Sequence, residues 1–198
     1  GIIGAASSRN VGKLLVQGLH KMEYRGYDSA GIALHQKDSI FSLKTLGKVT
    51  LLEDGMIEQR PKSKLGIAHT RWATHGAPTA ANAHPHAGKA AALVHNGIIE
   101  NFRPLRDELL ADGYAVESET DSEVVALLVS REVERGASPE DAVRTVLPRL
   151  RGAFALAIAF RDHPGMLIGA RRGSPLVVGY GDGETYIGSD ALALAPLT

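Results

Sequence analysis

Two apolar runs that each end in a cluster of polar side chains constrain this chain more than any other feature of its sequence. Residues 65–68 and 90–94 are expected to form buried strands. The segment 67–101, which includes their ends, contains five of the chain's eight histidines and its single tryptophan. A rigid scaffold usually presents binding and catalytic side chains at the ends of buried strands. We therefore interpret segment 67–101 as a functional site built on a sheet.

The composition is that of an ordinary globular protein. The 198 residues are 44% hydrophobic, which is enough for a buried core, and we treat residues 1–198 as one domain. Their formal net charge is zero, so nucleic acid and anionic membranes are not expected partners. No apolar run approaches the roughly 20 residues of a membrane span. The absence of cysteine excludes disulfides and leaves the cytoplasm as the expected location.

The order of the predicted elements favours an α+β fold. Apolar residues at helical spacing predict helices at about 10–22, 49–58, 102–111, 121–136 and from 139 onwards. Short apolar or alternating runs predict strands at 1–5, 31–35, 40–46, 65–68, 90–94, 115–117, 153–160, 166–170, 176–178 and 185–187. The strands at 153–160, 166–170 and 176–178 are expected to be buried on both faces. Clustering of like elements favours layers of sheets and helices over strict strand–helix alternation.

Local signals set several of the predicted helix boundaries. Asn101 is a candidate N-cap, and Gly113 is a suitable stop for the helix that follows it. Thr120 and Glu123 have the spacing of a capping box. Ser138, followed by proline, begins a further helix because proline suits the first helical turn.

The pair Asn96-Gly97 at the end of a predicted strand has two interpretations. An Asn-Gly pair commonly forms a tight turn. The same residues can also form an oxyanion hole from the Asn96 side-chain NH2 and the Gly97 backbone N–H, an arrangement that suits acyl transfer. The tetrapeptide that contains them does not decide between these interpretations.

Arg71 and Asp121 are candidate receptors for the charged groups of a ligand. A guanidinium group binds a carboxylate in a planar, two-pronged geometry, although most arginines are solvated surface residues. Asp121 lies at the start of a predicted helix, where an acid either caps the helix or binds an ammonium group. Facing one pocket, the two residues would together recognise a free α-amino acid.

Two other kinds of site are less well supported. His84 and His86, with three further histidines nearby, are compatible with a metal site, but neither an HExxH motif nor a cysteine ligand accompanies them. We therefore expect no metal. A serine nucleophile is not expected either, because the chain has no G-x-S-x-G turn. The residues alone thus indicate recognition and oxyanion stabilisation without a nucleophile.

Five motifs, in this order and over practically the whole chain, resemble one family. They are EYRGYDSAG (23–31), HTRWATHG (69–76), NAHPH (82–86), HNGIIEN (95–101) and SETDSE (118–123). Together they resemble the N-terminal glutaminase domains of the glutamine–fructose-6-phosphate aminotransferases (glucosamine-6-phosphate synthases), which are class II, N-terminal-nucleophile amidotransferases. Related enzymes such as amidophosphoribosyltransferase share the HNG turn, but the first two motifs fit the aminotransferases better.

The resemblance implies a fold and a reaction. The implied fold is a four-layer αββα sandwich of the N-terminal-nucleophile hydrolase type. The implied reaction is hydrolysis of L-glutamine to glutamate and ammonia, without a cofactor, by an N-terminal cysteine whose own α-amine acts as the base. An α-amine titrates near ~7.7–8.0 and a thiol near ~8.5, so the proton moves between groups of similar affinity.

The resemblance also implies roles for the residues in the motifs. Asn96 and Gly97 would form the oxyanion hole, Arg71 would bind the glutamine carboxylate and Asp121 its ammonium group.

Four further residues have implied positions around the ligand. Thr74 and His75 belong to the loop that closes over glutamine, and Trp72 matches the residue that gates the passage of ammonia. Arg25 lies in the motif near the nucleophile and is counted as catalytic. His84, His86 and His95 are expected to be structural.

The chain departs from the family pattern at its first residue. It begins Gly1-Ile2-Ile3 where the family begins Cys-Gly-Ile, so the nucleophilic cysteine is expected immediately before Gly1. The family also carries C-terminal sugar isomerase domains, absent from these residues, that use the ammonia to convert fructose 6-phosphate. The full-length chain is expected to be a homodimer. The alternatives are a catalytically inactive glutamine-binding domain and the glutaminase domain of a related amidotransferase.

Overall fold

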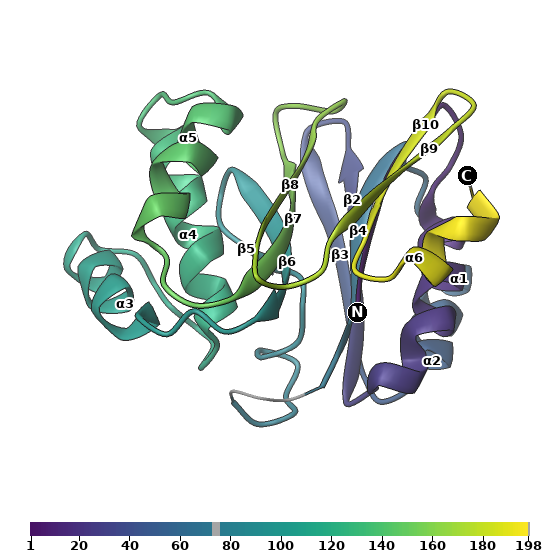
Figure 1. The fold of residues 1–198 in the computed structure, drawn as a ribbon, viewed down its shortest axis with the longest axis horizontal. Coiled ribbons are helices and arrows are strands. Elements are labelled where there is room, and N and C mark those ends of the chain that lie inside the picture. Colours follow the sequence, from purple (N-terminus) through teal and green to yellow (C-terminus); the bar gives the residue numbers. More distant parts are fainter. Residues whose placement is uncertain (73–75, 198) are drawn as a thin grey trace.

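Two antiparallel sheets face each other, and each carries helices on its outer face (Figure 1). The computed structural model describes residues 1–72 and 76–197, except for the side chain of Arg25. The larger sheet is covered by α1 (Gly12–Met22), α2 (Val49–Gln59) and α6 (Ala191–Leu194). On the smaller sheet lies α4 (Asp121–Glu134), with α3 (Phe102–Ala111) and α5 (Pro139–Val146) beside it. The expected α+β fold with four αββα layers is therefore confirmed.

The larger sheet has six strands in the order β3-β2-β4-β1-β10-β9. These are β3 (Ser39–Leu46), β2 (Ser29–Gln36), β4 (Leu65–Arg71), β1 (Ile2–Ala6), β10 (Glu184–Gly188) and β9 (Val177–Gly181). The smaller sheet has the order β5-β6-β7-β8, with β5 (His86–Ala87), β6 (Ala91–Gly97), β7 (Phe154–Phe160) and β8 (Leu167–Arg172). Short 3₁₀ turns are η1 (Glu23–Arg25), η2 (Leu147–Arg149) and η3 (Ala195–Leu197).

The core has three parts, one under the helices of each sheet and one between the sheets. The part between the sheets consists of Ile2, Ala33, Leu65, Ile67, Ala92, Val94, Ala155, Ala157, Ala159 and Ile187. Half of these residues are alanines, which allow the sheets to approach closely. No helix among the described residues is long and apolar enough to cross a membrane.

The predicted strand at 115–117 was wrong because its backbone is bound by a side chain instead of a neighbouring strand. The Glu123 carboxylate accepts the N–H of Glu117 at 2.9 Å and that of Ser118 at 2.6 Å. Thr120 does cap α4, since its hydroxyl accepts the N–H of Glu123. The capping box is thus only half formed, and its glutamate fixes the preceding loop.

Two further expectations need correction. Asn101 precedes α3 as predicted, but its side chain makes no cap hydrogen bond. It donates instead to the Arg149 carbonyl at 2.8 Å and accepts the Arg151 N–H at 2.9 Å. The strands predicted at 166–170 and 176–178 are not buried on both faces, because β8 and β9 are the edge strands of their sheets and largely lack a covering helix.

The packing between the sheets should dominate the stability of the fold. Ile67 is fully buried there, so Ile67→Ala should lower the free energy of unfolding by about 2–5 kcal/mol. The matched control is Ile57→Ala on α2, where the side chain is 62% exposed and the expected change is within about 0.5 kcal/mol. Urea unfolding measures both variants, and equal midpoints for the two would contradict this account of the core.

Candidate active site

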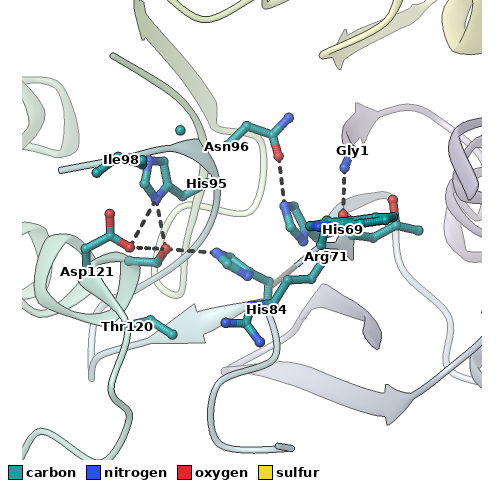
Figure 2. A pocket seen from close by; sticks show the side chains of 13 residues that line it. Gly1, His69, Arg71, His84, His95, Asn96, Ile98, Thr120 and Asp121 are labelled. Carbon is teal, nitrogen blue, oxygen red and sulfur yellow. Dashed lines mark hydrogen bonds and ion pairs between the residues drawn. The ribbon is translucent and has the colours of Figure 1, made fainter. Parts of the chain in front are cut away.

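A cavity of about 360 Å³ opens at one end of the space between the sheets (Figure 2). Its walls come from the start of β1, the ends of β4 and β6, and the start of α4. The lining residues are Gly1, His69, Thr70, Arg71, Trp72, His84, His95, Asn96, Gly97, Ile98, Thr120, Asp121 and Ser122. The cavity thus contains five of the eight residues predicted to bind substrate or act in catalysis, namely Arg71, Trp72, Asn96, Gly97 and Asp121.

The first residues of the chain are held on both sides by neighbouring strands. The Gly1 nitrogen donates to the Thr70 carbonyl at 2.6 Å, and the Thr70 N–H donates back to the Gly1 carbonyl at 3.0 Å. On the other side, the Ile2 N–H donates to the Ser189 hydroxyl at 2.8 Å. Gly1 therefore already belongs to the ladder between β1 and β4.

The register of this ladder determines where a preceding residue would point. Ile2 lies opposite His69 and packs between the sheets, whereas a Cβ at Gly1 would face Met22 of α1. Side chains alternate along a strand. A residue before Gly1 that continued β1 would therefore lie opposite Arg71 and point between the sheets, into the cavity.

The backbone at the end of β6 turns the Gly97 N–H away from β7. The N–H of Ile98 donates to the Ala153 carbonyl, so even-numbered residues of β6 bond to β7. Gly97 has φ of +113°, and a Cβ there would lie 2.1 Å from the Ala153 carbonyl oxygen. Glycine is therefore required at this position, because any side chain would collide with β7.

The Asn96 side chain reaches across to the other sheet. Its Oδ1 lies 2.9 Å from His69 Nε2 of β4. Figure 2 shows the amide oxygen toward His69 and the amide nitrogen on the opposite side. The NH2 group of Asn96 is thus presented away from the histidine.

Arg71 is a buried cation with hydrogen bonds to the loop that follows β4. The residue is only 4% exposed, and its guanidinium donates to the carbonyls of Gly76 at 3.2 Å and Ala77 at 3.3 Å. The carboxylate of Asp28 lies 3.9 Å away. Trp72, the next residue, is 70% exposed at the rim of the cavity.

Asp121 is a buried acid at the first turn of α4. It is 5% exposed, and its Oδ2 accepts the Ile99 N–H at 2.7 Å. Its Oδ1 accepts from the Ser122 hydroxyl at 3.3 Å. It lies at the N-terminal end of α4, where the helix dipole carries partial positive charge.

Four buried histidines cluster beside these charges, and three of them, His69, His84 and His95, line the cavity. His84 Nε2 and His95 Nδ1 lie 3.0 Å and 2.8 Å from the Ser122 hydroxyl, and the rings of His69 and His84 are 4.1 Å apart. Burial lowers the pKa of His69 and of His84 well below the ordinary value, and lowers the pKa of His86 to about 3. These three rings are therefore neutral at pH 7. In the described part of the chain, no group of three histidine, aspartate or glutamate side chains is arranged to hold a metal ion.

The structure does not place the side chains of the other three predicted site residues. Thr74 and His75 are outside the described residues, and so is the side chain of Arg25. Conversely, no role was predicted from the sequence for His69, which contacts Asn96, or for Ser122, which contacts Asp121. The alternation of β4 was the available signal, since it places His69 on the same face as Arg71.

Comparisons of this chain with protein families, with curated proteins and with solved structures agree with one another. The family model described as "Glutamine amidotransferase domain" matches residues 69–196. Glutamine–fructose-6-phosphate aminotransferases from Zymomonas mobilis and Mesorhizobium japonicum are 58% and 52% identical over the whole chain, which spans 33% of each relative. Among solved structures, the glutamine phosphoribosylpyrophosphate amidotransferase from B. subtilis matches with a TM-score of 0.84 and 25% identity, over 98% of this chain and 42% of that chain.

The neutral histidines predict a loss of stability in mild acid. His69, His84 and His86 stay neutral when folded but take up protons in the unfolded chain below about pH 6.5. The unfolded state then binds more protons, so the free energy of unfolding should fall as the pH falls, by up to about 4 kcal/mol per pH unit below pH 6. Urea titrations from pH 7.5 to 5.5 measure this slope.

The variant His86→Gln tests the origin of the slope. It removes one of the three groups and should reduce the proton uptake on unfolding by about one. A free energy of unfolding that stays constant from pH 7.5 to 5.5 would contradict the assignment of neutral buried rings.

Proposed function

This chain belongs to the glutamine amidotransferase domain family, and on that premise we propose that it is a glutaminase domain. It hydrolyses L-glutamine to glutamate and ammonia through a cysteine immediately before Gly1. The observation that carries the proposal is the β1–β4 register, because it directs the side chain of a residue before Gly1 into the cavity. The described chain has no cysteine, so the nucleophile lies outside its 198 residues.

The nucleophile is activated by its own terminal amine. The amine takes the proton of the thiol, and the sulfur attacks the side-chain amide carbon of glutamine. The tetrahedral intermediate then collapses, the carbon–nitrogen bond breaks, and the leaving nitrogen takes the proton to depart as ammonia. Water, activated by the same amine, hydrolyses the thioester and releases glutamate.

The oxyanion of each tetrahedral intermediate lies between two donors. One is the side-chain NH2 of Asn96, which points away from His69. The other is the N–H of Gly97, which the ladder turns away from β7. Fixed donors of this kind stabilise the charge that develops in the transition state without needing to reorient.

The two buried charges recognise the α-amino acid end of glutamine. Arg71 binds the carboxylate with its planar fork, and Asp121 binds the ammonium group. The neighbouring rings of His69 and His84 are neutral and carry no charge that would compete for the carboxylate. The family resemblance implies that Thr74 and His75 bind glutamine and that Arg25 supports the nucleophile, but these side chains lie outside the described residues.

The ammonia is passed to a second site in the full-length protein. The chain spans about a third of the length of the curated aminotransferases that it matches. We assign the rest to C-terminal isomerase domains that use the ammonia on fructose 6-phosphate, in a homodimer. Trp72, exposed at the rim of the cavity, gates this transfer.

The oxyanion assignment predicts a selective loss of turnover. In the full-length protein with its N-terminal cysteine, Asn96→Ala should lower kcat for glutamate release by about 10²–10³-fold while KM changes little, because the donor acts on the transition state. The control is Asn10→Ala, which removes an acceptor for the Ser63 N–H far from the cavity. Unchanged kcat in Asn96→Ala would refute the oxyanion role.

The carboxylate assignment predicts a loss of substrate discrimination. Arg71→Lys keeps the charge but loses the two-pronged geometry, so KM for glutamine should rise by about 10–100-fold. An analogue that lacks the α-carboxylate should be affected far less. The exposed Arg103 on α3 provides the matched control, Arg103→Lys. Equal losses for glutamine and the analogue would show that Arg71 acts only on the fold.

A further inference from the structure

We infer that His69 is a positioning residue that sets the orientation of the Asn96 amide. Its Nε2–H donates a hydrogen bond to Asn96 Oδ1, and this bond turns the NH2 group of Asn96 toward the oxygen that becomes negatively charged in the reaction. This inference rests on the proposed function, in which that NH2 group is an oxyanion donor. The mechanism itself assigns His69 no contact with substrate.

The contact joins the two sheets at the edge of the cavity. His69 belongs to β4 and Asn96 to β6, and their side chains approach to 2.9 Å. The His69 ring is 4% exposed and lies against the ring of His84, with centroids 4.1 Å apart and planes 31° apart. Packed in this way, the ring offers Nε2 to Asn96 from a fixed direction (Figure 2).

An asparagine amide can occupy such a site in two orientations of nearly equal shape. Its oxygen accepts and its nitrogen donates, so the group that meets His69 decides which end faces the cavity. If Nε2 carries the proton, it binds Oδ1 and the NH2 group faces the cavity. If Nε2 is unprotonated, it accepts a hydrogen bond from the NH2 group of Asn96. Asn96 Oδ1 then faces the cavity and repels an oxyanion.

The surroundings of the other ring nitrogen favour the first arrangement. Burial lowers the pKa of His69 well below its ordinary value, so the ring is neutral and has a single N–H. Its Nδ1 is buried without a hydrogen-bond partner among the described residues. Protonation at Nδ1 would leave the ring's only donor unpaired, whereas protonation at Nε2 pairs it with Asn96.

The first test uses three substitutions in the full-length protein with its N-terminal cysteine. Glutamine places an amide donor near the position of Nε2, asparagine places it near Nδ1, and phenylalanine provides none. His69→Phe and His69→Asn should lower kcat for glutamate release by about 10–100-fold with KM within about threefold, and His69→Gln should recover most of the loss. Three variants with wild-type kcat, or with losses confined to KM, would overturn the inference.

His35 provides the matched control. It is a buried histidine of β2 in the same sheet, and its Nε2 lies 2.6 Å from the Arg161 carbonyl, away from the cavity. His35→Gln and His35→Phe should leave kcat unchanged. A loss of kcat equal to that of the His69 variants would overturn a specific role for His69.

The second test does not depend on turnover. Long-range ¹H–¹⁵N correlation spectra of the ¹⁵N-histidine-labelled protein at pH 7 report which nitrogen of His69 carries the proton. We expect protonated Nε2 and bare Nδ1, and the opposite tautomer would overturn the inference. A wild-type protein that shows the expected tautomer but releases no glutamate would refute the proposed glutaminase function and leave the orientation of Asn96 standing.

Discussion

The antiparallel pairing of the first residues with β4 is the constraint on which the site depends. Gly1 and Thr70 exchange both backbone hydrogen bonds, and Ser189 fixes Ile2 from the other side. Because side chains alternate along a strand, this register decides that a residue before Gly1 faces the gap between the sheets. A shift by one residue would turn that side chain toward α1 and separate it from Asn96 and Arg71.

The polar residues of the cavity are buried at a cost that their hydrogen bonds offset. Arg71 donates hydrogen bonds to backbone carbonyl groups, and Asp121 accepts one from a backbone N–H group. His69 and His84 pair with an amide and a hydroxyl group, respectively, and stay neutral. Arg71 and Asp121 thus provide one buried cation and one buried acid, which together suit the carboxylate and ammonium groups of an α-amino acid. It also makes the stability of the fold sensitive to acid, because the same rings are protonated in the unfolded chain.

The sequence predicts local features better than contacts across the fold. Apolar runs locate β4 and β6, and Ser138 and Thr120 act as the caps that their spacing predicts. The bonds of Asn101 to segment 149–151 and of Glu123 to segment 117–118 were missed, since each depends on how a loop folds back. The bond between His69 and Asn96 depends on how two sheets pack, so no local pattern reveals it. The chemistry of Arg71, Asp121 and the Asn96-Gly97 pair indicated them as candidates, and the family resemblance then implied their specific roles.

The most direct test of the central claim is covalent labelling of the full-length protein with a diazoketone analogue of glutamine, followed by intact mass measurement and peptide mapping. The diazomethyl carbon of the analogue, which replaces the amide nitrogen, should alkylate the nucleophile with loss of N2 once the analogue occupies the cavity. The account predicts a single adduct on a cysteine immediately before Gly1, formed more slowly in the presence of excess glutamine. An adduct on another residue, or labelling that glutamine does not slow, would contradict it.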